Sequence, residues 1–216
     1  MRTLLALITA LGLSSSAFAQ TPVEPIEVTP FAGYLLGGSF LSSPTVPQAG
    51  FDQISLANHL DYGVRIGFNV TTAIEPEIQW SRSETHLAIT PTYPNLSLVD
   101  STIDYFLAGA NYNFSSGNIR PYVSLSLGAA RLFVNTPPFA LVGLHLTPAT
   151  TFAVSAGVGV KIFATRNFGF RFEARGYGSE MPSNFTASCT VGPLSSSCFH
   201  SWLLNGDFTG GIVAAF

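Results

Sequence analysis

The chain has 216 residues, of which 47% are hydrophobic and only 10% are charged, and its formal net charge is −3. An ordinary soluble domain carries roughly 25% charged residues, so this chain has too little charge to cover a water-exposed surface. After the N-terminal segment no stretch holds ~18 consecutive apolar residues, which excludes a transmembrane helix, and the small net charge does not indicate nucleic acid as a partner. A closed β-barrel is then the main remaining way to span a membrane.

The N-terminal segment has the features of a secretory signal peptide. Arg2 supplies the positive charge, Leu4–Leu13 forms an apolar core, and Ala17–Ala19 is a small-residue cleavage site. We therefore predict a signal peptide over residues 1–19 and one barrel domain over residues 20–216. An ordinary apolar first helix is the alternative interpretation of the same segment.

Eight segments of the remaining chain alternate apolar residues with polar or small residues, which is typical of β-strands. The predicted strands are Glu27–Gly37, Leu60–Val70, Ile74–Arg82, Thr102–Phe114, Arg120–Val134, Thr151–Ala164, Phe168–Tyr177 and Trp202–Phe216. Pro76 lies inside the third strand and predicts a β-bulge, because proline lacks a ladder donor. The phase of the fourth strand stays open, since the series from Phe106 competes with Tyr105 and Leu107 for the apolar face.

Long and short connections alternate between these strands. The long ones are Ser39–Asn58, Glu84–Val99, Asn135–Pro148 and Gly178–Phe199. Long outer loops alternating with short periplasmic turns are typical of a transmembrane barrel. We therefore predict an all-β fold, an antiparallel up-and-down transmembrane β-barrel of about eight strands.

The last predicted strand, Trp202–Phe216, is longer than the ~5–6 residues of a typical soluble strand and fits the ~9–11 residues of a tilted transmembrane strand. It alternates apolar residues through Phe208 and Ile212 and finishes on Phe216. In this the sequence resembles bacterial outer-membrane β-barrel proteins, in particular the small OmpA- and OmpX-like and opacity-type barrels. The resemblance implies that these three residues form a signal for the barrel assembly machinery. It also implies a protein surrounded by outer-membrane lipid, which we expect to be a monomer.

Alternation alone does not decide which face points outward, because a soluble lipocalin-type barrel has an apolar interior. The polar face here is rich in glycine and serine and carries few charges, of both signs, which favours an apolar exterior and a narrow lumen. The charges that we then expect in the lumen are Arg65, Glu75, Glu77, Lys161, Arg171, Glu173, Arg175 and Asp207. They should pair with one another, because an unpaired buried charge is very costly.

Short turns predict which of these charges meet. A turn at Val70–Thr72 would place Arg65 opposite Glu77. The turn near residue 165 would likewise place Gly159 beside Arg171, so that a small residue makes room for a large one. The paired charges can form either a salt-bridged plug or an ion pathway. We favour the plug, because the interior of an eight-stranded barrel is just wide enough for side chains to fill.

The histidines fall one to each long loop or its rim. They are His59, His86, His145 and His200. Imidazole suits zinc or copper, but no short ligand spacing supports a metal site, so we expect none.

A lipid-modifying enzyme is a further alternative. The lipid A deacylases pair His and Ser two residues apart, whereas His200 and Ser201 are adjacent and face opposite sides. We expect no enzymatic activity and no cofactor.

The long loops carry the remaining signals. Their apolar residues are Phe40, Leu41, Phe51, Leu87, Ile89, Tyr93, Phe139, Leu141, Leu144 and Phe185. They can pack over the barrel mouth or form an adhesive or ligand-binding surface, because exposed apolar patches often mark interaction sites. Cys189 and Cys198 are close in sequence, and export permits disulfides, so we predict a bridge that stiffens the fourth loop. The sequence favours a structural or surface-interaction (adhesin-like) barrel that meets extracellular partners through its loops, with a narrow pore as the alternative.

Overall fold

The computed structural model describes residues 24–40, 53–90, 97–134, 149–180 and 202–216. The described strands are β1 (Ile26–Phe40), β2 (Gln53–Leu56), β3 (His59–Phe68), β4 (Ile74–Thr90), β5 (Ser97–Asn113), β6 (Ile119–Val134), β7 (Ala149–Phe163), β8 (Phe168–Glu180) and β9 (Trp202–Ala215). Among the described residues there is no helix with the length and apolar character needed to cross a membrane.

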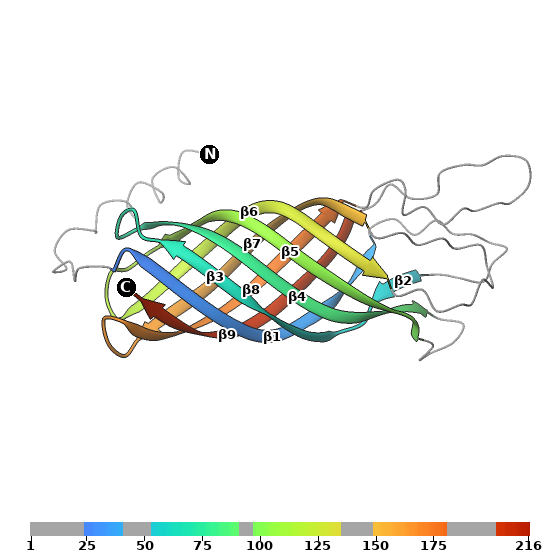
Figure 1. Cartoon of the computed structure of the whole chain (residues 1–216), viewed down its shortest axis with the longest axis horizontal. Helices are drawn as coiled ribbons and strands as arrows, with labels where there is room; N and C mark the ends of the chain where they lie inside the picture. The colour runs from blue at the N-terminus through green and yellow to red at the C-terminus, as the bar shows by residue number, and fades with distance from the viewer. Residues whose placement is uncertain (1–23, 41–52, 91–96, 135–148, 181–201) are drawn as a thin grey trace, which may run out of the picture.

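Eight of these strands form a closed antiparallel barrel. From β3 to β9 each strand pairs with the next, and β1 pairs with both β3 and β9, which leaves no free sheet edge in the wall. Figure 1 shows the tilted strands winding around one elongated barrel. The C-terminus lies at the end where short turns connect β3 to β4, β5 to β6 and β7 to β8, hereafter the turn end. The predicted fold class is confirmed.

Several strands extend further than predicted at the opposite end of the barrel, hereafter the loop end. β4 continues to Thr90 and β5 begins at Ser97, where the sequence predicted a loop over Glu84–Val99. β2 lies inside the predicted loop Ser39–Asn58 and pairs with β1 and β4. Backbone hydrogen bonds to neighbouring strands pair these extensions. Leu87 and Ile89 alternate with other residues in the β4 extension, but the nearby Pro91 and Pro94 favoured a loop over the whole segment.

The first predicted pairing across a turn is wrong by two residues. Arg65 lies opposite Gln79 rather than Glu77. The turn after β3 is centred one residue later than predicted, because the Thr71 hydroxyl oxygen accepts hydrogen bonds from two of the following backbone N–H groups (2.9 and 3.2 Å). Threonine turns of this kind compete with the tighter reversal that the sequence suggested.

The second predicted pairing is also wrong by two residues. Gly159 lies opposite Glu173 rather than Arg171. Two N–H groups of the turn at residues 164–167 donate to the Phe168 carbonyl oxygen (3.0 and 3.1 Å), which again moves the centre of the turn by one residue. A one-residue move of the centre changes the register by two, so the inward face of each strand is preserved.

Pro76 causes no bulge. The β4–β5 register passes through Pro76 and Ala110 without a shift. On the other side, the last β3–β4 pair joins Gly67 and Glu77, so Pro76 lies just beyond that ladder. In this register Pro76 lies opposite Phe68, and its missing N–H is met by a gap in the β3–β4 ladder rather than by an extra residue in the strand.

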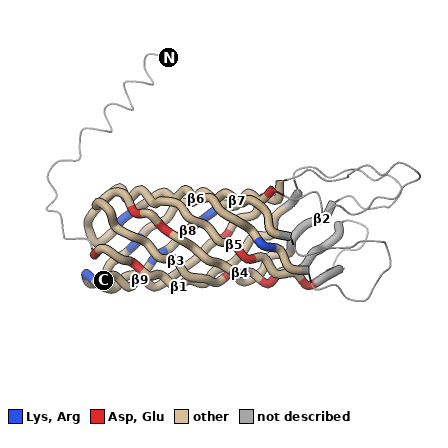
Figure 2. The backbone as a smooth tube through the Cα atoms, turned by 45° about the horizontal axis from the view of Figure 1, so that its top comes forward, with Lys and Arg blue, Asp and Glu red and all other residues tan. Residues whose placement is uncertain are grey.

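The barrel wall separates an apolar exterior from a polar interior. Large apolar side chains point outward on every long strand, as Leu125 does with 70% of its surface exposed, whereas Arg171 in the lumen is 1% exposed. The phase of β5 is also clear, since Phe106 is 50% exposed and Tyr105 only 2%. Acidic and basic positions are interspersed along the barrel rather than separated by sign (Figure 2). The apolar face is therefore the outer one, as predicted.

Candidate functional site

Near the turn end the lumen holds a first group of ion pairs. Lys161 on β7 lies between Glu27 on β1 and Glu75 on β4, with its Nζ atom 2.5 Å from a carboxylate oxygen of each. Arg120 Nη1 lies 3.7 Å from Glu27, and Asn113 Nδ2 donates to Glu75 Oε2 at 3.1 Å. Closure of the barrel brings these strands to face one another. The ammonium group of Lys161 thus forms ion pairs with two buried carboxylates.

The middle of the lumen holds a second group, which we call the central ion cluster: Arg65, Glu77, Arg171, Glu173 and Arg175. Arg171 binds Glu77 through Nη1 and lies 2.7 Å from Glu173 through Nη2. Arg175 reaches Glu173 at 2.5 Å and Glu77 at 3.3 Å. Arg65 Nη1 lies 3.6 Å from Glu173. Each carboxylate therefore has more than one cationic partner, which offsets the water that both groups lose on burial.

Neutral side chains complete the central ion cluster. The Tyr122 hydroxyl donates to Glu173 Oε2 and accepts from Arg171 Nε, both at 2.6 Å. Asn111 Nδ2 donates to Glu77 Oε2 at 2.9 Å. The predicted lumen set contained only charges and so missed Tyr122 and Asn111. Tyr122 on β6 and Asn111 on β5 lie at inward-pointing positions of the alternating pattern, and this pattern could have identified them.

Tyr122→Phe should lower the free energy of unfolding by about 2 kcal/mol, because it removes two charge-assisted hydrogen bonds and leaves their partners in place. Urea unfolding of the protein in lipid vesicles measures the difference. Tyr112→Phe is the matched control, since the Tyr112 side chain points outward from the neighbouring strand β5. Equal losses in the two variants would contradict the role given to the Tyr122 hydroxyl.

Beyond the central ion cluster, toward the loop end, the lumen is filled by apolar side chains that we call the apolar cap. Its buried members are Leu35, Ile103, Tyr105, Leu107, Ala130, Leu132, Ala153, Tyr177 and Leu203. The rings of Tyr105 and Tyr177 stack with their centroids 4.5 Å apart. The side chains of both the cap and the cluster are almost completely buried, so the lumen is filled at two successive positions along the barrel axis.

Asp207 lies where the central ion cluster meets the apolar cap. Its Oδ2 atom accepts a hydrogen bond from the Tyr177 hydroxyl at 2.7 Å. Asp61 on β3 is also buried in the lumen. The predicted lumen set included Asp207 but omitted Asp61 and Glu27, although both lie on the inward phase of their strands.

The structure places all eight predicted lumen charges in the interior. Phe208, Ile212 and Phe216 point outward on the last strand, where the resemblance assigns them to assembly.

His59 begins β3, and His86 lies in β4 with its side chain outside the described residues. Residues outside the described ranges include His145, His200, Cys189, Cys198 and the predicted signal peptide. Within the described ranges no group of three or more His, Cys, Asp or Glu side chains is placed to hold a metal.

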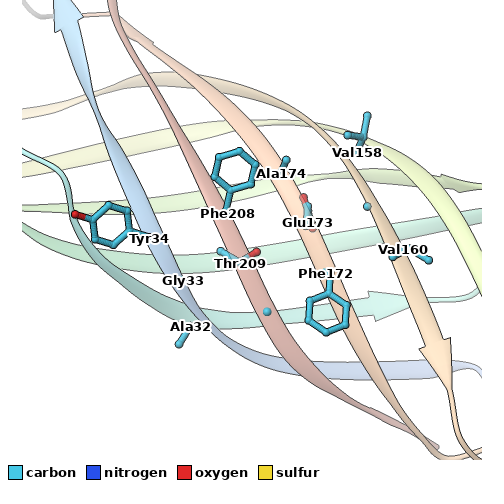
Figure 3. A pocket seen from close by; sticks show the side chains of 12 residues that line it. Ala32, Gly33, Tyr34, Val158, Val160, Phe172, Glu173, Ala174, Phe208 and Thr209 are labelled. Carbon is cyan, nitrogen blue, oxygen red and sulfur yellow. The ribbon is translucent and has the colours of Figure 1, made fainter.

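The outer wall carries a shallow apolar hollow of about 780 Å³ across β7, β8, β9 and β1. Figure 3 shows Tyr34, Phe172 and Phe208 standing around small residues that include Ala32 and Ala174. These aromatic side chains are exposed on the outer face of the barrel. The hollow therefore opens to the surroundings of the barrel and offers no route through the lumen.

Comparison with known proteins identifies the family. The family model of the outer membrane protein beta-barrel domain matches residues 3–191. The chain belongs to this family. A search of the curated proteins found no match. Because a member of this family lies in the bacterial outer membrane, its apolar exterior faces lipid.

Solved structures show the same fold at low sequence identity. Neisserial surface protein A (NspA) is 14% identical with a TM-score of 0.56, over 88% of this chain and 97% of that chain. The outer membrane protein OprG from Pseudomonas aeruginosa is 9% identical with a TM-score of 0.58, over 90% of this chain and 97% of that chain. This outer-membrane barrel therefore spans nearly the whole length of each.

Proposed function

We propose that this outer-membrane barrel is a closed, non-enzymatic protein that interacts with extracellular partners through its outer loops. The filled lumen is the observation that carries the proposal. The central ion cluster and the apolar cap follow one another along the axis, and both are buried. A solute would have to displace both levels, and displacing the first would separate Arg171 from Glu77 and Glu173.

A narrow pore for small solutes is the second candidate. Charged side chains along a lumen favour it, since rings of charge select ions in open channels. However, a conducting path needs charges that face water, and in the described part of the chain Arg65, Arg171 and Arg175 are each less than 4% exposed. The mutual pairing of these groups supports a plug that stabilises the barrel instead.

The surface role rests on the composition of the outer loops. Apolar residues such as Phe139, Leu141 and Leu144 are unusual in segments that should face the medium. NspA, which shares the fold, is named a surface protein. A closed barrel leaves the loops as the part of the protein able to meet a partner outside the cell.

The test is adhesion of cells that display the full chain. Phe139, Leu141 and Leu144 are changed together to serine, and binding to cultured epithelial cells and to polystyrene is counted. We expect a several-fold loss on at least one of the two surfaces. Val70→Ser is the control, because Val70 is exposed at the turn end. Unchanged adhesion, with equal amounts of folded protein at the surface, would overturn the proposal.

A further inference from the structure

A row of polar side chains crosses the apolar outer wall of the barrel from β3 to β6. The strand register joins Tyr62 to Arg82, Arg82 to Asp104 and Asp104 to Arg131. Asp104 shares the outward phase of β5 with Phe106, which is 50% exposed. Neighbouring strands therefore present this row on the lipid side of the wall. We call Arg82, Asp104 and Arg131 the outer charge row.

The outer charge row lies where the strands leave the hydrocarbon layer. β4 begins at Ile74, and the segment from Ile74 to Arg82 matches the ~9–11 residues that a tilted strand needs to cross a bilayer. The long loops of an outer-membrane barrel are extracellular, so the row lies at the headgroups of the outer leaflet. Between the turn end and the row, the outward positions of β4 and β5 hold only apolar or small residues: Ile74, Pro76, Ile78, Trp80, Phe106, Ala108, Ala110 and Tyr112.

The outer charge row contains two cations and one anion. Arg82 covers Asp104 and donates to its two carboxylate oxygens from Nε and Nη2, at 2.7 and 2.8 Å, which leaves Nη1 outside this pair. Arg131 is exposed, and among the described residues no salt bridge joins it to a carboxylate. The next outward acidic residues, Glu84 on β4 and Asp100 on β5, lie further toward the loop end. Positive charge therefore exceeds negative charge around Arg131.

Aromatic rings hold both guanidinium groups of the row against the wall. The guanidinium carbon of Arg131 lies 4.3 Å from the centroid of the Phe133 ring, and that of Arg82 lies 5.9 Å from the Trp80 ring. Stacking of this kind leaves the N–H groups at the edge of the guanidinium plane able to donate. β4 and β6 are separated by two strand spacings, about 9.5 Å, so the two long side chains can converge over β5.

We propose that Arg131 and Arg82 bind a phosphate group on the headgroup of an outer-leaflet lipid. The planar fork of donors on an arginine matches the oxygens of a phosphate. Directly toward the turn end, exposed apolar side chains such as Phe106 and Leu127 contact the acyl chains of the same lipid. A lipid therefore satisfies both parts of the surface, whereas a free phosphate would use only the outer charge row.

Native mass spectrometry of the folded barrel tests the site, because it counts the lipids that each chain retains. The mature chain is folded in an uncharged detergent and titrated with diphosphorylated lipid A, with a chelator present so that no divalent cation bridges the two. We expect one retained lipid per barrel and weaker retention of the dephosphorylated form. Arg131→Gln should lower the apparent affinity about fivefold, the contribution of one arginine near a membrane surface.

Arg166→Gln is the matched control, since it makes the same change of charge in the exposed turn between β7 and β8, at the turn end. It should leave the affinity unchanged. Asp104→Asn should raise the affinity, because it removes the carboxylate that competes with phosphate for Arg82. A purely structural role of the row would instead lower retention in Asp104→Asn. Heat-modifiable migration confirms that each variant is folded.

Three results would overturn the proposal. Equal retention of lipid A by Arg131→Gln and Arg166→Gln would show that the row contributes nothing. Equal retention of the phosphorylated and dephosphorylated lipids would mean that only the acyl chains are bound. Displacement of lipid A by millimolar inorganic phosphate would assign the row to free anions instead of a lipid. These measurements involve neither adhesion nor the outer loops, so their failure would leave the proposed surface function untouched.

Discussion

Arg171→Met should destabilise the barrel by about 3–5 kcal/mol, because it removes a buried guanidinium that binds two buried carboxylates. Arg171 binds both Glu77 and Glu173 and also donates to the Tyr122 hydroxyl. Arg175 remains 2.5 Å from Glu173 and 3.3 Å from Glu77, and Arg65 remains 3.6 Å from Glu173, but neither replaces the contacts that Arg171 makes. Urea unfolding in lipid vesicles, followed by tyrosine and tryptophan fluorescence, measures the loss.

Two further variants distinguish the effect of losing charge pairing from the effect of losing side-chain volume in this experiment. Arg166→Met changes an arginine in the exposed turn between β7 and β8, and should alter the stability by no more than about 0.5 kcal/mol. In Arg171→Met, Glu77 keeps its longer ion pair with Arg175 (3.3 Å) but loses its closest cation, so adding Glu77→Met should restore part of the lost stability. A double variant less stable than Arg171→Met alone would show that packing, not charge pairing, controls the cluster.

Gly159→Val should cost about 3 kcal/mol or more, because it adds a side chain where the central ion cluster leaves no space. A Cβ atom at Gly159 would lie 2.3 Å from the Tyr122 hydroxyl oxygen and 2.6 Å from the Phe172 carbonyl oxygen. The backbone of a closed barrel cannot move away from the new side chain. The Tyr122 hydroxyl must therefore break its hydrogen bond to Glu173 Oε2. The same urea titration measures the result.

Gly210→Val is the matched control on the lipid face. A Cβ atom there would meet only ring carbons of Phe172 at 3.6 Å, an ordinary van der Waals distance. The substitution should therefore be nearly neutral in a bilayer. If Gly159→Val and Gly210→Val were equally tolerated, the lumen would be far less tightly filled than the structure indicates.

The sequence predicted the barrel and its inside–outside pattern because both depend on a period of two. Arg171 and Glu173 alternate with phenylalanines on β8, and this local pattern survives any error in register. The partners of each charge could not be predicted, because they depend on where a turn is centred. The hydroxyl of Thr71 moved one such centre by one residue, which gave Arg65 a different neighbour.

The apolar cap was missed for a different reason. On β5 both phases are apolar, since Phe106 faces lipid while Tyr105 and Leu107 face the lumen. Alternation carries no information where both faces of a strand are buried in apolar surroundings. The stacking of Tyr105 on Tyr177 joins residues 72 positions apart and becomes visible only once the barrel closes.

Single-channel recording in a planar lipid bilayer tests most directly whether the lumen is closed. The mature chain and its Glu77→Gln variant are inserted, and heat-modifiable migration confirms that each is folded. We expect no stable current steps from the natural protein. Stable steps from the natural protein, with a size that changes in Glu77→Gln, would contradict it and would show that ions pass the central ion cluster.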